Sequence, residues 1–147
     1  MDDGQFSLQI AAFAARAKEN ANATVRQIII ELGNRLVLRS PVDQGDFRLA
    51  WIYSPDAPDT ELSHYGFNVS LLRMPANALG RVHYIQNRSP QAQVIEYGRY
   101  PNPPKHGTGK TIDGFSTQAP QGVVGLTVDE FSQITREAAQ TAKAGGD

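Results

Sequence analysis

The sequence predicts an α+β fold: a long N-terminal helix and a C-terminal amphipathic helix packed on a small antiparallel β-sheet, with a long Pro/Gly-rich arm. Three observations lead to this class. Near both ends of the chain, apolar residues recur every three or four positions, as on a helix with one buried face. Between these regions, short segments alternate apolar and polar residues at the period of a strand. Residues 99–122 show neither period and are rich in proline and glycine.

The first helix is predicted over about residues 5–39. Its apolar positions form one stripe: Phe6, Ile10, Phe13, Ala17, Ala21, Val25, Ile28, Leu32 and Leu36. At ~1.5 Å per residue this helix would be a rod of roughly 50 Å, longer than the core of a small domain covers. Two interpretations are open. The helix breaks near residues 20–24 into two shorter ones, or it is continuous and its overhang packs on a neighbouring subunit.

A corner is predicted where this helix ends. Pro41 biases Ser40 away from the helical region, so the helix should stop there. Asp43 and Gly45 are turn residues, since an aspartate can bond the backbone two residues on and a glycine tolerates positive φ. The segment ends in the single tryptophan of the chain. The residues assigned to this corner are Ser40, Pro41, Asp43, Gly45, Phe47, Arg48 and Trp51.

The sheet is predicted from three regions, around Phe47, Tyr65 and Val94. In the first, over about residues 47–53, Phe47, Leu49 and Trp51 alternate with other residues and are expected to anchor the core. In the second, over about residues 65–71, every other residue is apolar. Residues 83–87 and 94–97 can each be a strand or a turn of helix. Residues 74–82 are expected to be a loop or a single helical turn.

Glu96 lies between Ile95 and Tyr97 and is therefore expected to be partly buried. A buried carboxylate requires a partner, and Arg48 or Arg99 is expected to supply it in a structural role. The segment that follows, 98–122, has no period, and structureless loops longer than ~12–15 residues tend to be functional or disordered.

The last helix is predicted to begin at a capping box, with the hydroxyl of Thr127 three residues before the carboxylate of Glu130. Gly145 should end it. The apolar positions continue at helical spacing: Val128, Phe131, Ile134, Ala138 and Ala142.

Composition excludes several classes of protein. The 147 residues form one domain, 1–147, and the net charge of −1 provides no basic footprint for nucleic-acid recognition. The absence of cysteine excludes disulfides and thiolate metal sites. The acidic start, residues 1–4, lacks the features of a signal peptide, and no apolar run approaches the ~20 residues of a membrane span. We therefore expect a soluble protein with no membrane partner.

The catalytic motifs are incomplete. Residues 107–111 resemble a phosphate-binding loop, but Pro104 stands where the motif needs a glycine, five positions before Gly109. The three histidines, His64, His83 and His106, lack paired metal-binding spacing and are expected to be polar surface or interface residues. No Gly-x-Ser-x-Gly elbow marks a nucleophile. We expect no catalytic residue, cofactor or metal. The alternative is a small nucleotide-binding or hydrolytic enzyme that uses the Gly109-Lys110-Thr111 loop.

The ordered motifs resemble a known family. A long helix leads into Ser40-Pro41-Val42-Asp43-x-Gly45-x-Phe47-Arg48-x-x-Trp51, followed by Ile95-Glu96-Tyr97-Gly98, Ala119-Pro120-x-Gly122 and a C-terminal helix. This order is similar to that of the neck and tail-completion proteins of long-tailed bacteriophages, of the minor tail protein type. The family usually has Thr where Gln44 stands and a small or basic residue where Asp46 stands.

The resemblance implies a non-enzymatic virion protein of the tail or neck, which occupies the host cytoplasm during assembly. It implies a ring, with six copies as the family expectation, that caps the tail tube protein and meets the head-completion or connector protein. Packaged DNA would pass through the lumen without sequence-specific contact. Residues 99–122 would be the main intersubunit arm. Its candidate contact residues are Glu96, Tyr97, Gly98, Arg99, Tyr100, Pro101, Pro104, Lys105, His106, Lys110, Phe115 and Pro120.

Overall fold

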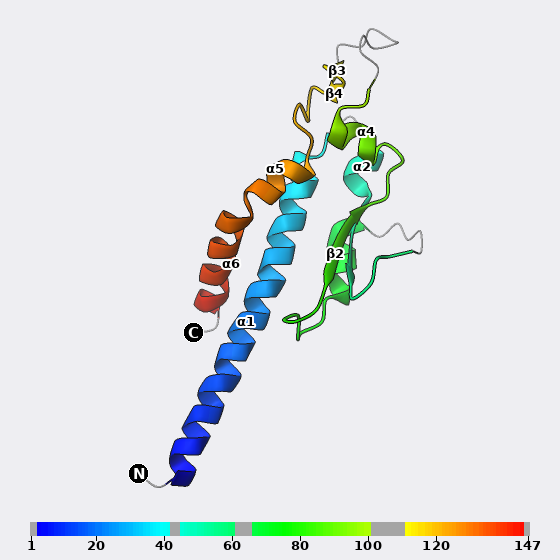
Figure 1. The fold of residues 1–147 in the computed structure, drawn as a ribbon. Coiled ribbons are helices and arrows are strands. Elements are labelled where there is room, and N and C mark those ends of the chain that lie inside the picture. Colours follow the sequence, from blue (N-terminus) through cyan, green and yellow to red (C-terminus); the bar gives the residue numbers. More distant parts are fainter. Residues whose placement is uncertain (1–2, 42–44, 61–65, 101–110, 146–147) are drawn as a thin grey trace.

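Helix α1 (Asp3–Arg39) forms the long axis of the molecule, and the other elements pack around its C-terminal half (Figure 1). The computed structural model describes residues 3–41, 45–60, 66–100 and 111–145. α1 runs without a break across residues 20–24, so the continuous helix is the correct interpretation. Its 37 residues correspond to a rod of about 55 Å at ~1.5 Å per residue.

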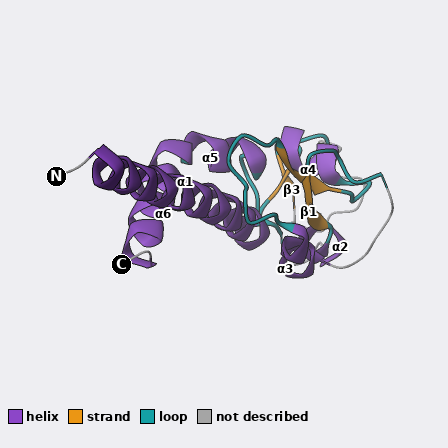
Figure 2. Cartoon of the chain, turned by 90° about the horizontal axis from the view of Figure 1, so that it is seen from below, coloured by secondary structure: helices purple, strands orange, loops and turns teal. Residues whose placement is uncertain are grey.

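The predicted α+β class is confirmed. A two-stranded antiparallel sheet, β1 (Trp51–Pro55) and β2 (His83–Asn87), lies on one side of α1, and α6 (Phe131–Gly145) packs along α1 (Figures 1 and 2). A short hairpin lies at the far end from the N-terminus. The remaining elements are α2 (Gly45–Leu49), α3 (Gly66–Ser70), the 3₁₀ turn η1 (Leu71–Arg73), α4 (Ala92–Tyr97), the hairpin strands β3 (Thr111–Ile112) and β4 (Phe115–Ser116), and α5 (Val124–Asp129).

The prediction that the first strand begins at Phe47 is wrong. Residues 45–49 form α2, and β1 begins only at Trp51. On a helix, residues two apart point in different directions, so Phe47 and Leu49 cannot share one buried face. Phe47 is buried, whereas the side chain of Leu49 is 74% exposed and does not anchor the core.

The strands predicted around Tyr65 and Val94 are also wrong. Tyr65 lies outside the described residues, and residues 66–70 form α3. Phe67 and Ser70, three positions apart, are the buried residues of α3, which is the spacing of a helix face. Val94 lies in α4. The strand that pairs with β1 is instead residues 83–87, one of the two alternatives for that segment.

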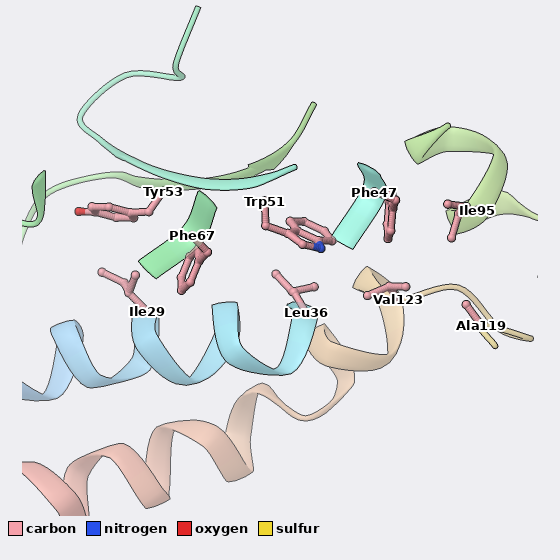
Figure 3. Packing of buried hydrophobic residues seen from close by; sticks show 9 residues of the cluster. All are labelled: Ile29, Leu36, Phe47, Trp51, Tyr53, Phe67, Ile95, Ala119 and Val123. Atoms are coloured by element: carbon pink, nitrogen blue, oxygen red, sulfur yellow. The ribbon is translucent and has the colours of Figure 1, made fainter. Parts of the chain in front are cut away.

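The hydrophobic core lies between α1, β1 and the short helices (Figure 3). The ring of Phe67 packs directly on α1 at Gly33, where an added Cβ would lie only 1.8 Å from the ring carbon Cζ. Gly33 is therefore needed for this close approach. The core cluster consists of Ile29, Leu36, Phe47, Trp51, Tyr53, Phe67, Ile95, Ala119 and Val123.

His83 is half-buried and is bonded within the fold through both ring nitrogens. Its Nε2 lies 2.8 Å from the carbonyl oxygen of Ala78, which can only accept, so Nε2 carries the proton. Nδ1 then accepts from the hydroxyl of Tyr53, also at 2.8 Å. Burial raises the pKa of the Tyr53 phenol above its ordinary value, with a further contribution from Asp56.

The predicted C-terminal helix consists of two helices, and the predicted capping box is not a helix start. Thr127 lies inside α5 and donates from its hydroxyl to the carbonyl of Val123, while α6 begins at Phe131. Ile134 and Ala138 are buried, as predicted. Of the other predicted core positions, Val128 and Phe131 are exposed and Ala142 is partly exposed.

Ion pairs connect α6 and its preceding turn to α1. Glu130 lies 3.1 Å from Arg35 and 2.5 Å from Arg39, and Arg35 also pairs with Glu137 at 3.2 Å. The hydrogen bond from Arg39, followed by that from Arg35, lowers the pKa of the Glu130 carboxyl below its ordinary value. The charged form of Glu130 is therefore the form that holds the two helices together.

No helix in the described part of the chain is long and apolar enough to cross a membrane.

The Glu130 pairs predict a dependence of stability on pH. A carboxyl with a lowered pKa in the folded state stabilises the fold above its ordinary pKa of ~4.3 and loses this effect as pH falls below that value. The free energy of unfolding of Glu130→Gln should therefore decrease less between pH 6 and pH 3 than that of the parent, measured by urea denaturation. Glu19→Gln, on the exposed part of α1, is the charge-matched control. An equal decrease in Glu130→Gln and the parent would contradict the assignment.

Candidate functional site

The N-terminal half of α1 extends beyond the rest of the molecule (Figure 1). Every described side chain from Gln9 to Asn20 is exposed. Two of them are large and apolar: Ile10 is 52% exposed and Phe13 is 72% exposed. We call residues 9–20 the α1 overhang.

The apolar row of the α1 overhang continues the row that α6 covers farther along α1. At about 3.6 residues per turn, eighteen residues make about five whole turns, so Ile10 is in line with Ile28, and Ala17 with Arg35. Arg35 pairs with Glu137 of α6. One face of α1 is thus covered by a helix in its C-terminal half and is open in its N-terminal half.

The corner between α1 and β1 is built on the hydroxyl of Ser40. This hydroxyl donates to the carbonyl of Leu36 at 2.7 Å and accepts from the indole Nε1 of Trp51 at 2.7 Å. Arg48 donates from Nε to the next carbonyl, that of Val37, at 3.0 Å. The side chains of Ser40 and Arg48 thus bond carbonyl groups in the last turn of α1.

The structure brings most of the predicted corner residues together. Ser40, Pro41, Phe47 and Trp51 are buried, and the rings of Phe47 and Trp51 meet edge to face with centroids 5.6 Å apart. Gly45 is the first residue of α2, and Asp43 lies outside the described residues.

The carboxylate of Glu96 caps the start of α5. It accepts backbone N–H groups from three successive residues: Val123 at 2.9 Å, Val124 at 2.5 Å and Gly125 at 3.3 Å. The expected partners, Arg48 and Arg99, do not bind it: Arg48 bonds the end of α1, and the guanidinium of Arg99 lies over the ring of Tyr97. A negative side chain at the N-terminus of a helix is favourable because of its unpaired N–H groups and dipole.

Gly122 allows this contact. Its φ is +81°, and an added Cβ would lie 2.6 Å from the carbonyl oxygen of Glu96. The Glu96 and Gly122 motifs, 26 positions apart in the sequence, are therefore one structural unit, which we call the Glu96 junction.

The hairpin β3–β4 is fastened beside the Glu96 junction. The ring of Phe115 packs on Gly98, where an added Cβ would lie 2.4 Å from the ring carbon Cε2. The amide of Tyr100 donates to the carbonyl of Gly114 at 2.9 Å. Residues 98–122 are therefore not structureless throughout, since glycines at 98 and 114 let two chain segments meet closely.

The predicted arm residues divide into two groups. Glu96, Tyr97, Gly98, Arg99, Tyr100, Phe115 and Pro120 lie at or next to the Glu96 junction. Pro101, Pro104, Lys105, His106 and Lys110 lie outside the described residues.

An open cleft of about 510 Å³ lies between the sheet and the Glu96 junction, and sequence reasoning did not find it. Its wall is largely apolar, because Phe47, Trp51 and Ile85 meet Val123 and Val124 there. Tyr97, 64% exposed, stands beside it. The cleft joins elements that are distant in the sequence, so no local pattern marks it.

The described residues give little support to metal or phosphate binding. No group of three or more His, Asp or Glu side chains there could hold a metal ion. Thr111, the last residue of the suspected phosphate loop, begins strand β3, whereas a phosphate-binding loop leads into a helix.

The hydrogen bonds at the corner predict that Ser40→Ala is less stable than the parent. The buried indole N–H of Trp51 would lose its acceptor, so the free energy of unfolding should fall by about 1–3 kcal/mol. Denaturant unfolding monitored by the fluorescence of this tryptophan would measure it. Ser132→Ala, at an exposed position of α6, should change stability little; an equally small effect for Ser40→Ala would disprove the role of its hydroxyl.

The Glu96 junction predicts that Glu96→Ala lowers the free energy of unfolding by about 0.5–2 kcal/mol, the range for losing a helix cap. Amide exchange at Val123 and Val124 should also become faster. Asp129→Ala, at the opposite end of α5, removes the same charge without removing a cap and should leave these amides unchanged. Unchanged exchange in Glu96→Ala would contradict the junction.

Comparison of this chain with family models, curated proteins and solved structures finds no match.

Proposed function

We propose that this chain is a non-enzymatic structural subunit of a long-tailed bacteriophage. It forms a ring, with six copies expected, that caps the tail tube and joins it to the head-completion or connector protein. DNA passes through the ring without sequence-specific contact, and the protein resides in the neck of the virion. The proposal starts from the resemblance of the ordered motifs, and the α1 overhang is the observation that supports it most.

The α1 overhang suits a subunit that completes its burial on a neighbour. Exposed patches of large apolar residues mark interaction surfaces in soluble proteins. Ile10 and Phe13 lie on a row that is already helix-covered in the other half of α1. A neighbouring copy that covers this row with a different surface makes a head-to-tail contact, and such contacts form a ring when the rotation closes.

The Glu96 junction supports the same function. Beside it, the described residues on either side of segment 101–110 are joined, since Tyr100 bonds Gly114 and Phe115 packs on Gly98. An intersubunit arm that starts from these contacts has a fixed origin on the subunit. The contacts lie toward the end of the molecule opposite the α1 overhang (Figure 1).

Phe13→Asp tests the α1 overhang. Because Phe13 is 72% exposed, the variant should keep the melting temperature of the parent. It should fail to complete tails when it replaces the parent in phage production, counted as joined particles in electron micrographs. Ala15→Asp places the same charge at an exposed position about 200° around the helix from Phe13, on the opposite side, and should assemble normally. Normal joining by Phe13→Asp would refute the proposed contact.

Lys110→Ala separates the proposal from the enzymatic alternative. Under the proposed function, this variant still yields joined particles. Under the alternative, loss of the ammonium group abolishes nucleotide binding or hydrolysis, measured by calorimetry with ATP and GTP on both proteins. Nucleotide binding by the parent that disappears in Lys110→Ala would overturn the structural assignment.

A further inference from the structure

Among the residues that the structure describes, strand β2 has an open hydrogen-bonding edge. The amide of Arg88 donates to Ala50, and the amide of Asp56 donates to Val82, which sets the phase of the β1–β2 ladder. In an antiparallel pair, every second residue of a strand hydrogen-bonds to the partner strand, and the residues between them face the other way. Tyr84 and Gln86 are therefore the residues that bond to β1. The backbone N–H and C=O groups of His83, Ile85 and Asn87 therefore point away from β1.

The matching edge of β1 is closed by side chains. The amide of Tyr53 donates to Ser70 Oγ at 2.8 Å, and its carbonyl accepts from Arg73 at 2.6 Å. Pro55 has no amide hydrogen. Tyr53 faces Ile85 across the ladder. In the described part of the chain, the backbone of Ile85 has no corresponding partner.

The sequence of β2 carries no protection against pairing. Edge strands are commonly blocked by charged residues or proline. The five residues of β2, His-Tyr-Ile-Gln-Asn, include neither Lys, Arg, Asp, Glu nor Pro. The edge also borders the 510 Å³ cleft, which Ile85 and Asn87 line.

We propose that β2 pairs antiparallel with β2 of a second copy of this chain, which joins the two sheets into one sheet of four strands. In the register centred on Ile85, Ile85 of one copy lies opposite Ile85 of the other, and His83 lies opposite Asn87. The uncharged strand opposes no like charges, so it is complementary to itself. Each Ile85 side chain then lies beside the cleft of the other copy.

This contact is distinct from the proposed ring. It uses the same surface on both copies, whereas a ring requires two different surfaces. It also adds strands to a two-stranded sheet, a size that is marginally stable alone. The inference holds or fails in the purified protein, without phage components.

Disulfide trapping tests the pairing, because the chain has no cysteine. Directly opposed residues of a hydrogen-bonded pair have Cα atoms about 5.5 Å apart, within the disulfide range of about 4.4–6.8 Å. Under mild oxidation Ile85→Cys should form covalent dimers at least about tenfold faster than Leu72→Cys, because pairing raises the effective thiol concentration. Leu72, 84% exposed, is the control for random collision. Equal rates would overturn the proposal.

Amide exchange of the unmodified chain provides a second test that needs no substitution. The amides of Tyr84 and Gln86 should be protected at every concentration, and those of Ile85 and Asn87 should gain protection as concentration rises. Exchange at Ile85 that stays fast at all concentrations would refute the pairing. Protection that appears only when tail tube protein is added would also refute it, and would identify that protein as the occupant of the edge.

Discussion

The hydroxyl of Ser40 is the point through which the long helix and the sheet are joined. It bonds the carbonyl of Leu36 inside α1 and the indole of Trp51 at the start of β1, in a buried setting. A buried polar group that loses its partner costs about 1–3 kcal/mol, so both bonds resist rearrangement. Arg48 adds a third link from α2 to the helix end. The direction in which β1 leaves α1 is thereby set.

This fixed direction determines which surfaces the molecule offers. The sheet and α6 cover the C-terminal half of α1, and the α1 overhang and the Glu96 junction lie toward opposite ends of the molecule (Figure 1). A subunit with different contact surfaces at its two ends is suited to head-to-tail association. The open edge of β2 lies between them and supports a separate, two-fold contact. The Glu130 ion pairs hold α6 against the covered half of α1.

The short central elements show why part of the fold was mispredicted. In residues 66–70, the alternation of Phe67 and Val69 fits a strand, but the spacing of Phe67 and Ser70 fits a helix equally well. Five residues are too few for the two periods to differ, so packing decides. Here Phe67 reaches α1 through Gly33, a contact between elements more than thirty positions apart in the sequence. Leu49 was misplaced for the same reason, because α2 is only five residues long.

The sequence by itself determined the features whose cause is local. These are the helical character of residues 5–39, the stop at Ser40, the buried positions Ile134 and Ala138 of the last helix, and the Pro/Gly-rich segment that lacks a helix or strand period. Only the tertiary structure decided which segments pair in the sheet and what binds Glu96. The partners of Glu96 are backbone amides at residues 123–125, and every residue type except proline carries such an amide. A side-chain pattern cannot mark them, because their position depends on where the fold places a helix start.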